Sequence, residues 1–276
     1  MRLCLSLIFS FVLLALTLPN SILAANSLEI KSSINISSSS SISSSNKVTI
    51  YNSADVPEVN GEFDDPKDKM VKVRVFVHGR RSHNTQSNNI CTDADSTRRV
   101  DTERWRLPAS VTYNINPSSV PASVGADNFS NLITQASFSV WQSAVLSKVN
   151  FSRGSDTNTS SSSYDGQNIV AFGNTSSFTL GVTYIRYMRF SRQVVDVDTI
   201  LNKNLSWGML NACVNNTSSY DVQNILTHEL GHWIGLDDEY SSRFVNHTMY
   251  GYGYKGEIRK TTLTSGDINS AKSIYP

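Results

Sequence analysis

The chain has 276 residues, of which 17% are charged, and a formal net charge of +1 at pH 7. Its short basic clusters, Arg80-Arg81 and Arg98-Arg99, are typical of solvated surface, so the charge pattern gives no indication of a DNA or RNA partner. Beyond a low-complexity N-terminal region, roughly two hundred residues remain, which is enough for one domain with a substantial core.

The first 25 residues have the layout of a signal peptide. An apolar run from Leu3 to Leu18 is followed by small residues at Ala24 and Ala25. The run is shorter than the about twenty residues that a membrane span requires. We therefore expect cleavage near residues 24–25, secretion, and no stable membrane insertion after cleavage. The alternative is an uncleaved anchor.

Residues 26–66 are rich in serine, with near-continuous runs over 37–41 and 43–45. Such a stretch has too little apolar surface to pack, so it is expected to be a flexible linker or part of a propeptide. Ordered structure should resume by about residue 70, because valines at alternate positions predict a strand over Met70–His78. The globular domain is therefore expected to span residues 67–276, with its core at 100–276.

Residues 105–201 are expected to contain several strands and one long helix. Apolar residues within 129–145 recur at the spacing of a helix that packs on a sheet. Alternating or continuous apolar runs predict strands over 111–116, 149–151, 168–172, 179–187 and 194–201.

Residues 228–238 carry a metal-ligand pattern. His228 and His232 are four residues apart, so on a helix both imidazoles lie on one face, with Glu229 beside them. This is the spacing of a zinc hydrolase, in which two histidines hold the ion and the glutamate serves as a general base.

A third ligand is needed, because a catalytic zinc has three protein ligands and one open position for water. Gly235 can take a positive φ and end the helix, so that the following residues fold back toward the metal. Asp238, three residues beyond this glycine, is the favoured third ligand. Asp237 and His247 are the alternatives.

These residues resemble the signature of the metzincin metallopeptidases, H-E-x-x-H-x-x-G-x-x-H, in the variant with a final Asp that occurs in snapalysin-like branches. Met249 resembles the family's Met-turn, and Leu263–Tyr275 resembles the last helix of matrixin-type domains. The resemblance implies an α+β fold. Its parts would be a twisted, mostly parallel sheet, an active-site helix, a long backing helix and a C-terminal helix.

The resemblance also implies a function, that of a secreted zinc-dependent metalloendopeptidase that cleaves proteins or peptides and is expected to be a monomer. Glu229 would be the general base, and Met249 would lie beneath the zinc without binding it. An edge strand ahead of the active-site helix would bind extended substrate by backbone pairing through Leu180, Gly181 and Val182. The segment Glu239–Gly256 would form the wall of the specificity pocket.

The chain departs from typical matrixins in two respects. No histidine occurs between residues 84 and 227, so we expect one catalytic zinc ion and no second, structural one. Cys91 lacks the flanking residues of a cysteine switch. In an oxidising compartment Cys91 and Cys213 are expected to form a disulfide, although two separate buried thiols are the alternative.

Three further interpretations of the sequence are possible. By family resemblance Asp196 and Asp198 could contribute to a calcium site, although ordinary loop or strand-edge carboxylates are the simpler interpretation. The chain could be a secreted surface or interaction protein that keeps the fold without turnover, but then Glu229 would have no role. An aspzincin-type metallopeptidase would also use an Asp ligand, but it would leave Gly235 and the Met-turn unexplained.

Overall fold

The computed structural model describes residues 56–81, 90–145, 148–214 and 217–276. The expected signal peptide, residues 1–25, and most of the expected linker, residues 26–66, lie outside these ranges. The chain divides into two compact units, Met1–Val48 and Thr49–Pro276, and all of the described residues belong to the second. Among the described residues, no helix has both the length and the apolar character needed to cross a bilayer.

A mixed sheet forms the framework of this unit, with the strand order β1-β2-β6-β7-β5-β3-β4 and a short β10 beside β2. Its strands are β1 (Gly61–Asp64), β2 (Val71–Arg80), β3 (Ser110–Ile115), β4 (Asn150–Asp156), β5 (Asn168–Gly173), β6 (Thr179–Met188), β7 (Val194–Asn202) and β10 (Tyr252–Gly253). Two further strands, β8 (Trp207–Gly208) and β9 (Tyr220–Asp221), pair with each other. The predicted strands between residues 70 and 201 are thus confirmed, whereas β1 lies within the segment that was expected to be a flexible linker.

The prediction of a mostly parallel sheet is correct for only one half of it. Pairing is parallel from β7 through β5 and β3 to β4, and antiparallel from β7 through β6 and β2 to β1. The antiparallel pairing of β6 with β7 has a simple cause. A turn of a few residues joins β6 to β7, and so short a connection permits only antiparallel neighbours.

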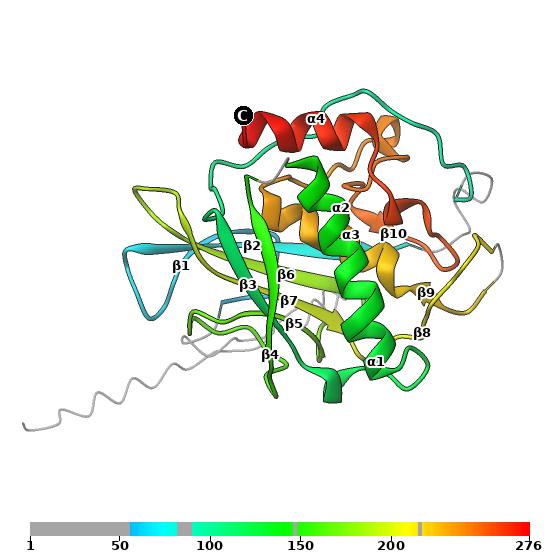
Figure 1. Cartoon of the computed structure of the whole chain (residues 1–276), viewed down its shortest axis with the longest axis horizontal. Coiled ribbons are helices and arrows are strands. Elements are labelled where there is room, and N and C mark those ends of the chain that lie inside the picture. Colours follow the sequence, from blue (N-terminus) through cyan, green and yellow to red (C-terminus); the bar gives the residue numbers. More distant parts are fainter. Residues whose placement is uncertain (1–55, 82–89, 146–147, 215–216) are drawn as a thin grey trace, which may run out of the picture. The chain divides into compact units, whose positions relative to one another are not determined.

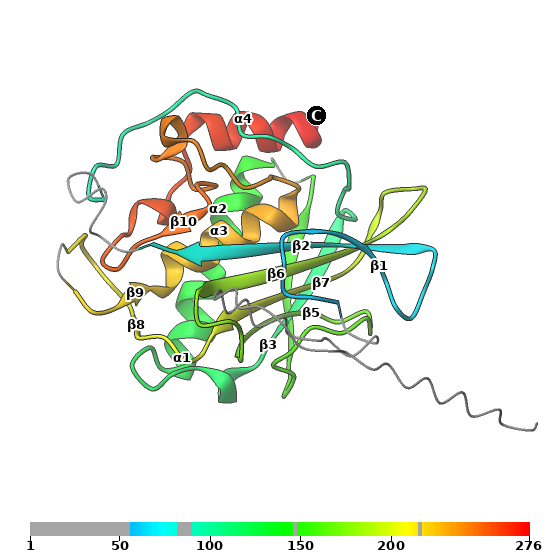
Figure 2. The same cartoon turned by 180° about the vertical axis from the view of Figure 1, so that it is seen from behind.

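The helices lie mainly on one face of the sheet (Figures 1 and 2). They are α1 (Ala126–Asn128), a π-helical turn (Phe129–Ile133), α2 (Thr134–Ala144), α3 (Val222–Ile234) and α4 (Ser265–Ile274). Short 3₁₀ turns occur at Pro117–Ser119, Ser242–Phe244 and Arg259–Thr261. The predicted helices over 129–145 and near the C-terminus are confirmed as the π-helical turn with α2 and as α4.

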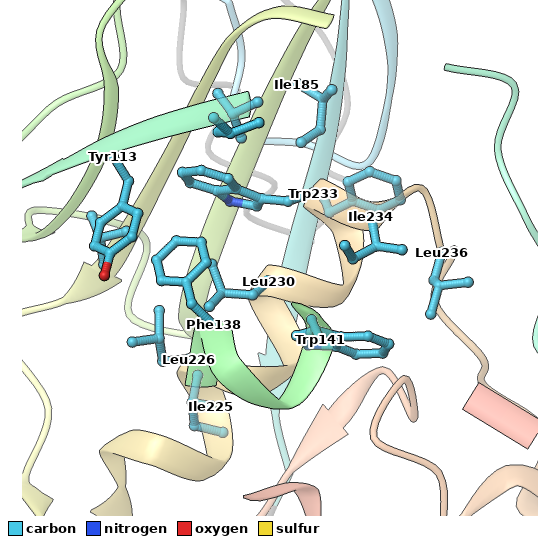
Figure 3. Close-up of a cluster of buried hydrophobic side chains, with 14 of the residues drawn as sticks. Tyr113, Phe138, Trp141, Ile185, Ile225, Leu226, Leu230, Trp233, Ile234 and Leu236 are labelled. Carbon is cyan, nitrogen blue, oxygen red and sulfur yellow. The ribbon is translucent and has the colours of Figure 1, made fainter. Parts of the chain in front are cut away.

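The main hydrophobic core lies between α2, α3 and the sheet (Figure 3). Trp233 of α3 packs edge-on against Phe138 of α2, with ring centroids 5.3 Å apart. The indole N–H of Trp141 donates to the carbonyl of Thr227 at 2.7 Å, so this buried polar group is satisfied. These contacts hold α3 in a fixed position under the sheet.

Strand β6 is an internal strand, not the edge strand that the sequence analysis predicted. On one side it pairs with β7, and on the other with β2, from Val71 opposite Met188 to Gly79 opposite Thr179. Local sequence patterns identify strands but not their order in a sheet. The pairing of β2, from the N-terminal part of the chain, with β6 was therefore not predicted.

Candidate metal centre and active site

Helix α3 presents His228, Glu229 and His232 toward the antiparallel half of the sheet. Asp221 caps the helix by accepting a hydrogen bond from the backbone N–H of Asn224 at 2.7 Å. The helix ends at Gly235, whose φ of 106° lies in the left-handed region that favours glycine. This is the helix end that the sequence analysis predicted.

Beyond Gly235 the chain turns back, and Asp238 comes to lie against both histidines. Its Oδ1 is 3.2 Å from Nε2 of His228 and 3.7 Å from Nε2 of His232. Two bonds of about 2.0 Å at a tetrahedral angle place their ligand atoms about 3.3 Å apart. The spacing of these three atoms therefore suits one zinc ion.

The ligand atoms have no hydrogen-bond partner among the described residues, although they are buried. The buried atoms without a partner are Nε2 of His228, Nε2 of His232, Oδ1 of Asp238 and Oε1 of Glu229. Buried polar atoms are rarely left unpaired unless an ion or a water completes them. The residues present thus fit a bound cation, and two imidazoles with one carboxylate are a donor set that zinc accepts.

The opposite nitrogen of each histidine is fixed by a backbone carbonyl. Nδ1 of His228 lies 2.7 Å from the carbonyl oxygen of Thr248, and Nδ1 of His232 lies 2.9 Å from that of Leu236. A carbonyl accepts only, so each Nδ1 carries the proton and donates it. Each Nε2 therefore presents its lone pair to the shared centre, as a metal ligand requires.

Burial sets the ionisation of the group. It lowers the pKa of His228 well below its ordinary value and that of His232 to about 3, so both rings are neutral. Burial also raises the pKa of Asp238, and it raises that of Glu229 to about 8. The ligand atoms are buried, so a divalent cation there would find little competing solvent.

Met249 lies directly against α3 and is fully buried. A Cβ at Gly231, which directly precedes His232, would lie only 2.2 Å from the Met249 sulfur. Thr248, the residue before it, is anchored through its backbone N–H, which donates to Asp267 at 3.1 Å. The turn that carries Met249 is thus packed against the helix segment between the candidate ligands, where the resemblance implied a Met-turn.

The other candidate third ligands lie in different environments. Both ring nitrogens of His247 have neighbours away from the centre, Nδ1 at 3.3 Å from Asp267 and Nε2 at 2.9 Å from Ser96. Asp237 accepts a hydrogen bond from Arg74 at 3.2 Å. Within the described part of the chain, Asp238 is the carboxylate that lies together with both helix histidines.

Glu229 is held by a chain of hydrogen bonds from the sheet. The hydroxyl of Thr183 donates to Glu229 Oε2 at 2.7 Å and lies 2.8 Å from the hydroxyl of Thr199, its partner across β6 and β7. The indole N–H of Trp233 donates to Thr199 at 2.9 Å. One carboxylate oxygen is therefore fixed, and the other, Oε1, lies 3.3 Å from Nδ1 of His78 on β2.

Strand β6 passes directly over Glu229. A Cβ at Gly181 would lie 2.7 Å from Glu229 Oε1, so this position accepts no larger residue without a shift. Leu180, Gly181 and Val182, the predicted substrate-binding residues, are thus beside the candidate general base. Their outer edge is paired with Val77 and His78 of β2.

Two residues of the site, His78 and Lys260, were not predicted from the sequence. The His78 ring lies 3.7 Å from that of His228, and its Nδ1 is 3.3 Å from Glu229 Oε1. Lys260 is fully buried, and its Nζ lies 3.0 Å from His78 Nε2. Burial lowers the pKa of Lys260 to about 8. His78 lies on the same face of the strand as Lys72, Arg74 and Phe76, opposite the alternating valines. This alternation was the sequence pattern from which its position on that face could have been predicted.

The expected disulfide is confirmed: Cys91 and Cys213 are joined, with their Cα atoms 5.4 Å apart. The candidate calcium ligands have another cation beside them. The Arg186 guanidinium donates to Asp196 at 2.8 Å and to Asp198 at 3.0 Å. Both carboxylates thus belong to a buried ion-pair network, and calcium binding there stays a prediction without a contact to support it.

Comparison with known proteins identifies one family. The family model described as Matrixin matches residues 104–276, which include α2, α3, α4, the turn of Met249 and every candidate ligand of the metal centre. No curated protein and no solved structure matches the chain significantly. Strands β1 and β2 lie ahead of the matched residues.

Proposed function

The chain belongs to the matrixin family of zinc metallopeptidases, and we propose that it is a secreted endopeptidase with one catalytic zinc ion, held by His228, His232 and Asp238. One observation carries the assignment: the buried, unpaired atoms of these three side chains converge at the spacing that zinc requires. The apolar N-terminal run and the disulfide support secretion.

Bound zinc would supply a Lewis acid for the scissile carbonyl and for the attacking water. Glu229 then accepts a proton from that water through Oε1 and delivers it to the leaving amine. The hydrogen bond from Thr183 to Oε2 fixes the carboxylate, so that Oε1 is the oxygen left to accept the proton. The backbone carbonyls of Thr248 and Leu236 hold the two imidazoles in position throughout.

Substrate would bind as an extended strand along Leu180, Gly181 and Val182, because these residues run past Glu229. Backbone pairing of this kind gives affinity without strong sequence preference. Binding there requires that the edge of β6 be free of β2.

The ligand assignment is tested by elemental analysis of purified wild-type protein, Asp238→Ala and His247→Ala. We expect about one zinc per chain in the wild type and in His247→Ala, and a large loss in Asp238→Ala. Full zinc retention in Asp238→Ala would refute the assignment. Casein or gelatin cleavage, with Glu229→Ala as the control, separates a peptidase from a protein that keeps the fold without turnover.

A further inference from the structure

Strand β2 lies in the groove where the proposed function places the substrate. It pairs in antiparallel fashion with β6, with Val77 opposite Val182 and His78 opposite Gly181. On its other side it pairs with β10 in parallel, with Gly79 opposite Tyr252. Figure 2 shows β2 running alongside β6 toward β10. A segment of the chain itself thus fills the space between the two expected walls of the cleft.

The side chains of β2 that face α3 cover the candidate catalytic group. Phe76 is fully buried and stacks on His232, with ring centroids 3.8 Å apart and planes inclined by 5°. His78 is fully buried against His228 and lies 3.3 Å from Glu229 Oε1. This is the oxygen that must face the attacking water, so water and substrate cannot reach it while β2 stays in place.

Lys260 fixes the orientation of the His78 ring. Its Nζ lies 3.0 Å from His78 Nε2 and donates to the carbonyl of Tyr252 at 3.0 Å. An ammonium group only donates, so Nε2 accepts, and the ring proton of His78 sits on Nδ1, which faces Glu229. The strand therefore sets a ring N–H 3.3 Å from Oε1 of the general base, although the two atoms form no hydrogen bond in this arrangement.

We propose that β2 is an inhibitory strand, whose backbone occupies the substrate groove and whose His78 caps Glu229, so that hydrolysis requires removal of residues 56–81. The inference rests on the proposed peptidase function. Within the described residues, both cysteines, Cys91 and Cys213, are held in the disulfide, so neither blocks the centre. Histidine on a paired strand would perform the blocking instead.

The chain's connectivity permits such a removal. The residues that match the family begin at 104, beyond β2, and they contain all the candidate ligands and the general base. The disulfide begins at Cys91, so hydrolysis of a peptide bond between Arg81 and Cys91 leaves the strand held by no covalent link. One water is consumed, and one new carboxylate and one new amino terminus are formed.

The test starts from the full chain with a cleavage sequence for a site-specific protease inserted after Arg81. Casein hydrolysis is measured before and after cutting, and the cut protein is diluted so that the noncovalent strand can dissociate. We expect at least about a tenfold gain in activity after cutting and dilution, with the circular dichroism spectrum preserved. Measurable casein hydrolysis that is equal before and after cutting, or loss of the folded spectrum once the strand is removed, would each overturn the inference.

Binding of a fluorescent peptide covering residues 70–81 to the cut, strand-depleted protein gives a readout that does not depend on activity. We expect the peptide to bind, and the His78→Ala and Phe76→Ala peptides to bind about tenfold more weakly. The control is Lys72→Ala, because Lys72 pairs with Asp64 of β1 at 2.6 Å and not with the site. Absence of binding, or equal binding of all four peptides, overturns the inference. If peptide binding follows the expected order while no form hydrolyses casein, the peptidase proposal fails and the assignment of the strand stands.

Discussion

Replacing Arg186 by methionine would break a buried ion-pair network that joins β6 to its neighbours. The guanidinium donates to Asp65 at 3.1 Å, to Asp196 at 2.8 Å and to Asp198 at 3.0 Å. The arginine side chain is 4% exposed. Methionine keeps much of the aliphatic volume but leaves the carboxylates without their cation.

Removing one partner of a buried pair costs about 3–5 kcal/mol, because an uncompensated charge stays in a dry environment. For a domain of this size 1 kcal/mol corresponds to about 2–4 °C, so the melting temperature should fall by roughly 6–20 °C. Arg189→Met is the matched control, since Arg189 pairs with Asp64 at 2.7 Å while 31% exposed. An exposed pair of this kind is worth about 0–1 kcal/mol.

Thermal and urea unfolding, followed by the fluorescence of the four buried tryptophans, measures both variants. The loss in Arg186→Met should shrink at pH 5, where protonation of the carboxyl groups removes the uncompensated charge. If Arg186→Met were no less stable than Arg189→Met, the network would not hold the strands together and the reasoning from burial would be wrong.

Four further predictions concern stability and catalysis. Gly231→Ala should destabilise the chain by about 1–3 kcal/mol and displace Met249, because the added Cβ would lie 2.2 Å from its sulfur. Urea unfolding measures this loss. The control Gly208→Ala should show no such loss, because the atoms nearest to its added Cβ are 3.6 Å away. Thr183→Val should lower kcat by about tenfold with zinc content unchanged, since it removes the hydrogen bond that holds Glu229. The control Thr183→Ser should retain activity. A loss of zinc in the valine variant would contradict a positioning role for Thr183. Reduction of the disulfide, whose cysteines are 122 residues apart, should cost up to about 5 kcal/mol in a thermal shift assay with dithiothreitol. Burial raises the pKa of Asp198 from 3.8 to about 8. The folded state therefore keeps a proton that the unfolded chain releases, and the free energy of unfolding should fall as pH rises from about 4 to 8. Urea midpoints across this range should vary less in Asp198→Asn, and equal pH dependence would contradict the shift.

The sequence predicted best what depends on local spacing. Helix α3 and its glycine end were predictable because ligand spacing, capping and a positive φ are all set within a few residues. The individual strands were equally accessible from their apolar runs. Three candidates for the third ligand remained, because the path of the chain after Gly235 depends on packing against distant segments. The structure brings Asp238, and not Asp237 or His247, to the two histidines.

The position of β2 could not be predicted, since strand order is a property of the whole sheet. Alternation in residues 71–78 showed that one face carries valines and the other Lys72, Arg74, Phe76 and His78. It did not show which strand would be the neighbour. Once the register sets His78 opposite Gly181, the histidine must meet Glu229, because the glycine runs directly over that carboxylate. A single nonlocal pairing thus decides whether the groove is open.

The ion pairs of the N-terminal segment indicate what its departure would cost. Asp65 is one of three carboxylates around Arg186, so its loss would leave two acids for one base and reduce the excess negative charge of the network. Arg74 is different, because it pairs with two acids outside the N-terminal segment. Glu103, at 2.9 Å, directly precedes the residues that match the family, and Asp237, at 3.2 Å, lies within them. Those partners are part-exposed, so water can replace the guanidinium at modest cost. The main resistance to release is then the buried ring of Phe76, the buried valines on the opposite face of β2 and the backbone pairing with β6. An extended substrate could restore the pairing.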